Sequence, residues 1–438
     1  RLMFVSGRDL LSRFANHLPR DVTVLIHDEP LTTRQPPALP EVLSSAPSPR
    51  PPAPAALATI LYTSGTTGQP RGVMLSHHNL ASNAASLADS FDPDDDEVRL
   101  CVLPLSHIYA RTCDLYTWVY RGTRLILAEH RETLARDLQL ARPTALNAVP
   151  YIYQKIADRI RSAGGDEAAA VRNFFGGRIE VLNCGGAPLA PEVESWFATR
   201  GQPVLMGYGL TETSPVIAAS TPSAHRAGAV GRLLPNVEAV IANDGELLTR
   251  GPNLMLGYWR DEAATAAAIR DGWFHTGDLA ALDADGFLSI HGRKKELIVL
   301  STGKKVAPSR VELLLTASPL IEQAAVFGDG HCGLLALIVP STTAPLACGL
   351  ARPQTDDERH ATYTAEITRC LAPAAREEQI HAFALLDRPF SIERGELTAK
   401  LSLCRSVIAQ NFAADLKRLI SQPLQVETAP AKSLESAR

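Results

Sequence analysis

Short apolar runs alternate with longer stretches of mixed polar and apolar residues along most of this chain. Residues 124–129 and 144–150 are such runs, and each precedes a stretch whose apolar positions recur with helical spacing. Strands that alternate with helices pair in parallel, and they are apolar throughout because helices cover both faces of their sheet. The pattern therefore predicts an α/β fold with a parallel sheet.

Changes in this pattern near both ends divide the chain further. Residues 1–34 begin as strand, helix and strand, so we expect the end of an N-terminal βαβ subdomain that is incomplete, because the pattern starts at once from Arg1. Residues 35–56 are rich in proline, alanine and serine, which predicts an extended linker without a core of its own. Residues 422–438 have the composition of a disordered tail.

Composition and charge exclude several classes of function. A chain of 438 residues predicts two or three domains, and 45% hydrophobic with 21% charged residues is ordinary for a globular protein. The net charge of −4 gives no indication of nucleic acid as a partner. The seven cysteines form no CxxC pair, and no apolar run reaches transmembrane length. We therefore expect a cytoplasmic protein with buried thiols.

The stretch YTSGTTGQPRGV, residues 62–73, carries the densest set of candidate anion-binding groups. Glycines in a turn that leaves a strand let several backbone N–H groups face one concavity, which binds anions. Hydroxyl groups add neutral donors, and Arg71 adds a permanent charge for phosphate oxygens. No Gly-Lys-Ser/Thr closes the stretch, so it is not a Walker A loop. A flexible polar loop is the alternative, but the ordered run favours phosphate binding by Thr63, Ser64, Gly65, Thr66, Thr67, Gly68 and Arg71.

A second stretch, PVLMGYGLTETSP at residues 203–215, joins an apolar run to polar residues. We expect a buried strand that ends at Gly207 and presents Tyr208 between two glycines, as a platform for a stacked base. Glu212 follows four residues after Tyr208. A carboxylate close to a triphosphate is a ligand for Mg²⁺, a cation that prefers oxygen.

Two further places combine small or charged residues with predicted strand ends. Gly185–Ala187 is a predicted tight turn before a helix, where a flat ring can approach the backbone closely, although a plain connecting turn would look the same. Asp278 is expected at a strand end, where its carboxylate can accept two hydroxyl groups of a ligand and Arg293 supplies a matching donor. A structural salt bridge between Asp278 and Arg293 is the alternative.

Together these stretches resemble the adenylate-forming enzymes, the superfamily of acyl-CoA synthetases, peptide-synthetase adenylation domains and luciferases. GYGLTE, residues 207–212, matches the core motif of that superfamily fully, and Arg71 stands where its members usually carry lysine. The resemblance covers about residues 1–413. The other matching stretches are residues 245–259, 272–296, 300–312, 323–340 and 388–403, of which the last two are specifically similar to long-chain fatty acyl-CoA synthetases.

The resemblance implies both a fold and a reaction. The implied fold is a large multi-layer α/β AMP-binding domain with parallel sheets at residues 57–293, followed by a small mobile α+β domain at residues 294–421. The two would swivel at or beside Lys294 and Lys295. The implied reaction uses ATP and Mg²⁺ to activate a fatty acid to an acyl-AMP and then transfers the acyl group to CoA. We expect at most peripheral association with the inner membrane face, while acyl chain length and oligomeric state stay open.

The resemblance also assigns roles to individual residues. The predicted phosphate loop would hold the β- and γ-phosphates, and Thr67 with Glu212 would hold the metal. Thr211 would lie near the α-phosphate, and His107, in a PLxH motif, would lie beside the acyl carboxylate. The pair Asp278 and Arg293 would fix the ribose. The remaining implied contacts are Gly186, Ala187, Pro188, Gly207, Tyr208 and Gly209 for adenine, and Gly303 and Lys304 for CoA.

One motif departs from the family pattern. In long-chain synthetases a catalytic lysine directly follows a Thr-Leu pair, but the matching position here is Ser402, and a lysine stands two residues earlier at Lys400. We take Lys400 as the candidate catalytic lysine and leave open whether it compensates for Ser402. Two alternatives remain: an acyl-AMP ligase that loads a carrier protein, although its usual insertion after the hinge is not seen, and a catalytically weakened protein that binds nucleotide and acyl chain.

Overall fold

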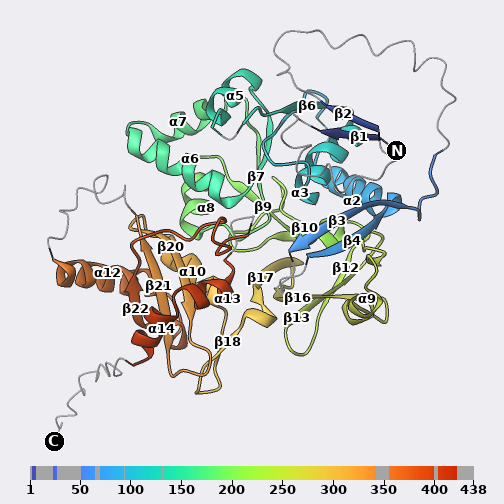
Figure 1. The fold of residues 1–438 in the computed structure, drawn as a ribbon. Coiled ribbons are helices and arrows are strands. Elements are labelled where there is room, and N and C mark those ends of the chain that lie inside the picture. Colours follow the sequence, from blue (N-terminus) through green and yellow to red (C-terminus); the bar gives the residue numbers. More distant parts are fainter. Residues whose placement is uncertain are drawn as a thin grey trace, which may run out of the picture. The chain divides into compact units, whose positions relative to one another are not determined.

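The computed structural model describes residues 2–5, 23–26, 51–64, 70–92, 94–130, 132–341, 355–398 and 403–421 (Figure 1). The chain divides into two compact units, residues 1–52 and 53–438. In the first unit, strands β1 (Leu2–Val5) and β2 (Thr23–Ile26) pair in parallel, as the two strands of a βαβ unit do. The helix expected between them lies outside the described residues.

In the part of the second unit that the structure describes, the central element is a mixed sheet of twelve strands. Five neighbouring strands are parallel in the order β6-β5-β7-β8-β9, which confirms the parallel sheet predicted from the apolar runs. These strands are β5 (Val98–Cys101), β6 (Arg124–Leu127), β7 (Ala145–Ala148), β8 (Val181–Cys184) and β9 (Val204–Gly209). The helices that lie between them in the chain include α5 (Leu134–Ala141), α6 (Pro150–Ala163), α7 (Glu167–Phe174) and α8 (Pro191–Ala198).

The same sheet becomes antiparallel beyond β9. The strands that follow in the sheet are β10, β11, β17, β16, β13 and β12, and β15 pairs with β16. A turn at residues 283–286 joins β16 to β17, with the Asp283 N–H donating to the Phe287 carbonyl at 3.0 Å. The bounds are β10 (Val216–Ala219), β11 (Gly231–Leu233), β12 (Glu238–Ile241), β13 (Glu246–Arg250), β15 (Ile269–Arg270), β16 (Trp273–Leu282) and β17 (Phe287–Arg293).

A smaller three-stranded sheet carries the glycine-rich stretch. Its strands are β3 (Leu57–Ser64), β4 (Pro70–Ser76) and β14 (Gly257–Tyr258), and β4 lies between the other two. Strand β4 leads directly into helix α2 (His77–Asp89), which a capping box starts: the Ser76 hydroxyl accepts from the Asn79 N–H, and the Asn79 side chain accepts from the Ser76 N–H. Helix α9 (Glu262–Ala268) follows β14.

Residues 101–110 are largely apolar, but only the first of them belongs to a strand. Strand β5 ends at Cys101, and the chain then turns, with the His107 N–H donating to the Pro104 carbonyl at 3.0 Å. Proline has no N–H for a strand ladder, so Pro104 favours the turn. Three short helices follow: α3 (Ile108–Ala110), the π-helix η3 (Arg111–Tyr116) and α4 (Thr117–Arg121).

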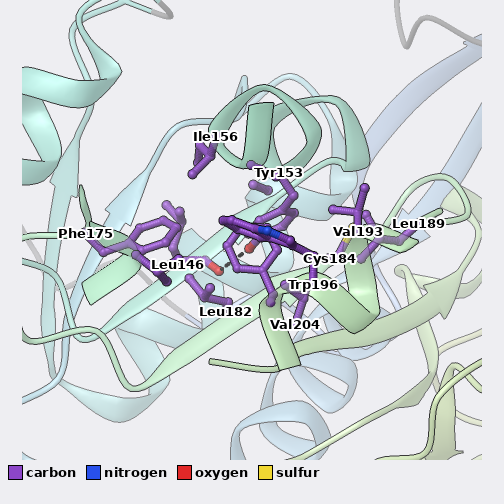
Figure 2. Close-up of a cluster of buried hydrophobic side chains, with 14 of the residues drawn as sticks. Leu146, Tyr153, Ile156, Phe175, Leu182, Cys184, Leu189, Val193, Trp196 and Val204 are labelled. Atoms are coloured by element: carbon purple, nitrogen blue, oxygen red, sulfur yellow. Dashed lines mark hydrogen bonds between the residues drawn. The ribbon is translucent and has the colours of Figure 1, made fainter. Parts of the chain in front are cut away.

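A core of large side chains fixes the parallel strands beneath helices α6 and α8 (Figure 2). Tyr153 and Trp196 each pack edge-to-face against Phe197, with ring centroids 5.7 and 4.9 Å away. The Tyr153 hydroxyl donates to backbone carbonyls of Leu146 and Asn183, at 3.4 and 2.8 Å (Figure 2 draws the first). The helices are thereby joined to β7 and β8 close to the ends of these strands.

Residues 294–421 contain a separate small sheet with helices on both faces. Strands β20 (Ile321–Phe327), β21 (Leu334–Pro340) and β22 (Ile380–Leu385) lie in that order. Alternate residues of β21 face two different cores, one shared with α10 and α12 and the other with α13 and α14, which confirms the α+β expectation. The remaining elements are η5 (Lys294–Glu296), β18 (Ile298–Val299), β19 (Lys305–Val306), α10 (Pro308–Thr316), α12 (Asp356–Cys370), α13 (Arg405–Asn411) and α14 (Ala413–Ile420).

Candidate active site

Most of the predicted site residues that are described line one large open cavity of about 4550 Å³, which extends beyond them to residues of β20, β21 and α14. The cavity lies in the second unit, next to the ends of β8 and β9 and the hairpin of β3 and β4. Gly303 and Lys304 are not part of its lining; they lie in the turn between β18 and β19, where the Lys304 ammonium is 3.6 Å from Glu377. The predicted residues that line the cavity are Thr63, Arg71, His107, Gly186, Ala187, Pro188, Gly207, Tyr208, Gly209, Thr211, Glu212, Asp278 and Arg293.

The centre of the predicted phosphate loop lies outside the described residues, which include neither Gly65, Thr66, Thr67 and Gly68 nor the C-terminal pair Lys400 and Ser402. The strands on either side of the loop are described. Thr63 pairs with Arg71, and Ser64 with Pro70, across β3 and β4. Residues 65–69 therefore connect two directly paired strand ends, and Arg71 stands at the base of that connection.

The turn after β8 has the shape that the sequence predicted. Gly186 has a φ of +84°, which favours glycine, and Gly186, Ala187 and Pro188 are exposed. A Cβ on Gly185 would lie 3.2 Å from the ring of Tyr109, so a side chain at Gly185 would press on that tyrosine. The backbone of this turn is accessible to a flat ring, which keeps the adenine assignment as a prediction.

Strand β9 continues two residues beyond the predicted end at Gly207. Tyr208 and Gly209 still pair with β10, opposite Ala218 and Val216. A Cβ on Gly209 would lie 1.7 Å from the carbonyl oxygen of Pro215, so only glycine fits where the chain folds back on itself. The glycine next to Tyr208 therefore serves the close approach of two strands.

Tyr208, Asp278 and Arg293 form one hydrogen-bonded group. The Tyr208 hydroxyl donates to Asp278 Oδ2 at 2.6 Å, and Arg293 Nε lies 3.0 Å from Asp278 Oδ1. Asp278 lies inside strand β16, not at its end as expected, directly opposite Arg293 on β17. Burial raises the pKa of the Asp278 carboxyl, although the Arg293 charge and the Tyr208 hydrogen bond act in the opposite direction. The salt bridge that the sequence left as the alternative is thus present, at a place that lines the cavity.

Buried polar groups hold the turn that contains Thr211 and Glu212 through hydrogen bonds to its backbone. The turn is a short 3-10 helix, η4 (Thr211–Thr213). The Asn253 side chain donates to the Thr213 carbonyl at 2.9 Å, and the Ser214 hydroxyl donates to the Asn253 carbonyl at 2.8 Å. The Met255 N–H donates to the carbonyl of Glu212 itself at 2.9 Å. The backbone of Glu212 is therefore held by residues 253–255.

Tyr258 connects Glu212 with Arg71, a role that the sequence reasoning missed. Its hydroxyl donates to Glu212 Oε1 at 2.9 Å, and the guanidinium carbon of Arg71 lies 5.5 Å from the centre of its ring. Arg71 Nε also lies 3.8 Å from Asp261 Oδ2. The signal was the GYW at residues 257–259, which closes a matching stretch but had received no role.

The carboxylate of Glu212 fits a Mg²⁺ ion that is shared with phosphate. Among the described residues, its Oε2 has no hydrogen-bonding partner, and no cluster of three or more histidine, cysteine or acidic residues could hold a metal. Mg²⁺ typically takes one or two carboxylates together with substrate phosphates and water, so it does not need a cage made entirely of protein.

Models of known families match both parts of the chain. The AMP-binding enzyme model matches residues 1–259, and the model of the AMP-binding enzyme C-terminal domain matches residues 295–422. This chain belongs to the AMP-binding enzyme family. It is a member of the adenylate-forming superfamily, close to the fatty acyl-CoA synthetases. In the part of the chain that the structure describes, no helix is both long and apolar enough to cross a membrane.

Individual family members agree with this assignment. The chain is 34% identical over 421 residues to a long-chain-fatty-acid–CoA ligase of Mycobacterium bovis, covering 83% of this chain and 69% of that protein. It is 29% identical to a peroxisomal long chain acyl-CoA synthetase of Arabidopsis thaliana, covering 85% and 62%. ATP-bound MatB from Rhodopseudomonas palustris has a similar structure, with a TM-score of 0.71 and 26% identity over 94% of this chain and 79% of that one.

Proposed function

We propose that this chain is an AMP-forming fatty acid–CoA ligase. The observation that carries the proposal is that Arg71 and Glu212, both within the family match at residues 1–259, line the same cavity as the group of Tyr208, Asp278 and Arg293. The relatives named long-chain-fatty-acid–CoA ligase supply the substrate class.

In the proposed reaction a fatty acid carboxylate attacks the α-phosphorus of ATP. The bond to the bridging oxygen breaks, pyrophosphate leaves with that electron pair, and an acyl-AMP forms. The thiol of CoA then attacks the acyl carbon, loses its proton and displaces AMP. Both steps spread negative charge over phosphate oxygens, so fixed positive charges and N–H donors near them lower the barrier.

Each residue of the cavity has a proposed task in this reaction. Arg71 binds the β- and γ-phosphates together with the loop at residues 63–68, and Thr211 lies at the α-phosphate. Glu212 and Thr67 hold Mg²⁺, which supplies positive charge to the phosphate oxygens when bound. His107 orients the acyl carboxylate. The nucleoside is held by Asp278 and Arg293 at the ribose and by Tyr208, Gly207, Gly209, Gly186, Ala187 and Pro188 at the adenine.

The proposal includes a division into two moving parts. Residues 57–293 form the large domain and residues 294–421 the small one, with a hinge at Lys294 and Lys295. The separate family matches over residues 1–259 and 295–422 support this boundary. Gly303 and Lys304 lie beyond the hinge, so a rotation can bring them to the acyl-AMP for the CoA step. We further propose that contact with the membrane, which would supply the fatty acid, is peripheral.

A pyrophosphate-release assay with ATP, Mg²⁺ and palmitate, with and without CoA, tests the proposal. We expect pyrophosphate in both cases and palmitoyl-CoA when CoA is present. Glu212→Gln should abolish most of the activity, whereas Glu262→Gln, which changes an exposed carboxylate on α9, should not. Pyrophosphate without a CoA thioester would favour the carrier-protein ligase. Nucleotide binding without release of pyrophosphate would favour the other alternative, a catalytically weakened protein in which Ser402 replaces the family lysine.

A further inference from the structure

The phenol of Tyr258 lies between Glu212, the proposed Mg²⁺ ligand, and Arg71, a proposed phosphate ligand. Its hydroxyl donates to Glu212 Oε1, and its ring lies beneath the guanidinium of Arg71. Tyr258 is 8% exposed, whereas the Arg71 side chain that lies over its ring is 40% exposed. A tyrosine hydroxyl is protonated at neutral pH, so it can act as the donor in the hydrogen bond to Glu212.

The position of Tyr258 is fixed by the hairpin that carries the phosphate loop. Tyr258 pairs with Val73 on β4, and its N–H donates to the Thr265 hydroxyl of α9 at 2.8 Å. The residue before it, Gly257, has a φ of +143°, and a Cβ there would lie 2.8 Å from Thr265. Glycine at 257 therefore lets α9 approach closely enough for Thr265 to hold Tyr258.

The same short segment supports Glu212 at two points. The Met255 N–H holds the backbone carbonyl of Glu212, and Tyr258, three residues later, holds one oxygen of its side chain. The other oxygen, Oε2, is without a hydrogen-bonding partner among the described residues. A hydrogen bond from a neighbour to one oxygen of a carboxylate fixes its rotamer and orients the second oxygen as a metal ligand.

We propose that Tyr258 is a positioning residue for Mg·ATP: it orients Glu212 as a Mg²⁺ ligand and ties that carboxylate to Arg71 at the phosphate loop. The inference rests on the proposed function, which assigns Glu212 to the metal. Tyr258 touches neither ATP nor the metal in this account. It acts through Glu212, so its effect must vanish when Glu212 can no longer bind the ion.

The test is Tyr258→Phe, which removes the hydroxyl and keeps the ring beneath Arg71. The affinity for ATP is measured by isothermal titration calorimetry over a range of Mg²⁺ concentrations and in excess chelator. We expect the Mg²⁺ concentration that gives half of the metal-dependent gain in affinity to rise about 10- to 100-fold in Tyr258→Phe. The affinity without Mg²⁺ should match that of the wild type, since Arg71 and the ring are unchanged.

Two further variants separate positioning from a loss of stability. Tyr363→Phe removes another buried tyrosine hydroxyl, which donates to the Leu320 carbonyl, and it should lower the melting temperature without moving the Mg²⁺ midpoint. In a Glu212→Gln background, adding Tyr258→Phe should change the affinity for ATP less than twofold. An unchanged Mg²⁺ midpoint in Tyr258→Phe overturns the inference, as does a full additional loss in the Glu212→Gln background. Failure of the proposed function shows separately, as wild-type protein that binds Mg·ATP but releases no pyrophosphate with fatty acids.

Discussion

The hydroxyl of Tyr208 on β9 donates a 2.6 Å hydrogen bond to Asp278 on β16, two strands that are not neighbours in the sheet. The other oxygen of Asp278 faces Arg293, so both oxygens already have protein partners. This arrangement links a proposed adenine contact to the proposed ribose carboxylate. A nucleotide whose base stacks on Tyr208 and whose ribose binds Asp278 would therefore contact two side chains that are already hydrogen-bonded to each other.

The first prediction concerns this unit. Asp278→Ala removes a charged acceptor and should weaken ATP binding by roughly 1.5–3 kcal/mol. Tyr208→Phe should have a smaller effect, because it removes a neutral donor and keeps the ring. Calorimetric titration with ATP measures both, and Asp95→Ala, at an exposed acidic turn, is the control. Wild-type affinity in Asp278→Ala would reject the ribose assignment and leave the salt bridge as purely structural.

A second prediction concerns the pH dependence of stability in the small domain. Glu396 is fully buried, and Arg388 donates to both of its oxygens at 2.7 and 2.8 Å, while Asn411 adds a third bond. Hydrogen bonds from Arg388 lower the pKa of Glu396 from its ordinary 4.5 to about 2. The unfolded chain therefore binds this proton more tightly than the folded chain does. Its stabilisation is present above about pH 4.5 and is lost as the pH falls toward about 2.

Glu396→Gln should consequently destabilise the protein by roughly 2 kcal/mol at pH 7 and flatten the loss of stability below pH 5. Chemical denaturation at a series of pH values measures the free energy of unfolding. Glu322→Gln, on the exposed side of β20, should keep the pH dependence of the wild type. If the free energy of unfolding of Glu396→Gln falls as steeply below pH 5 as that of the wild type, another group controls the acid sensitivity.

The sequence indicated where candidate site residues lie, but it did not indicate the contacts that hold them. Arg71 and Glu212 could be found because they stand in short motifs whose order is visible along the chain. Tyr258 and Glu212 are 46 residues apart in the sequence. Asn83, whose side chain donates to the Val216 carbonyl, is 133 residues from Val216. Such pairings depend on tertiary packing, and short sequence patterns do not indicate which distant residues will meet.

Hydrophobicity also gave wrong predictions of where two strands end. Residues 101–110 are apolar enough for a strand, yet β5 ends at Cys101 because Pro104 and the helices after His107 take over. The opposite error occurred at Gly207, where pairing with β10 extends β9 through Gly209. In both places the hydrogen-bond partners of the backbone decided the end of the strand, and hydrophobicity did not.

A third prediction concerns the hinge. Lys294–Glu296 forms a single 3-10 turn directly after β17, and Lys294 is bound to Asp244 and to Glu246 of the large domain. Lys295→Pro restricts backbone rotation at this turn, so it should impair thioester formation more than adenylation. Pyrophosphate release measures the first step, and palmitoyl-CoA made from preformed palmitoyl-AMP measures the second. Lys295→Ala removes the charge but not the rotation and serves as the control. Equal losses in both steps for Lys295→Pro would contradict a hinge at this position.

The last prediction concerns the lysine that the family motif lacks here. The bridge between Leu397 and Leu403, together with the Cys404 N–H that donates to the Glu396 carbonyl at 2.8 Å, holds together the two ends of the segment that contains Lys400 and Ser402. Two residues of chain span at most roughly 7 Å, so Lys400 and Ser402 are no further apart than that along the backbone. A lysine stem spans part of that distance, so Lys400 is a candidate for rescue.

Loss of one preorganised donor slows a reaction on the order of 10²–10³-fold. We therefore expect slow formation of acyl-AMP but near-normal transfer when preformed acyl-AMP and CoA are supplied, because the family lysine serves adenylation. Ser402→Lys should accelerate pyrophosphate release, whereas Ser402→Ala should leave it unchanged. If Lys400 compensates, Lys400→Ala will slow adenylation further without affecting transfer; if it is a bystander, neither step will change. The opposite outcome is a wild type that forms acyl-AMP fast, with neither Ser402→Lys nor Lys400→Ala changing the rate. That result would show that this site is not compromised, because restoring a missing catalytic charge must raise the rate of adenylation.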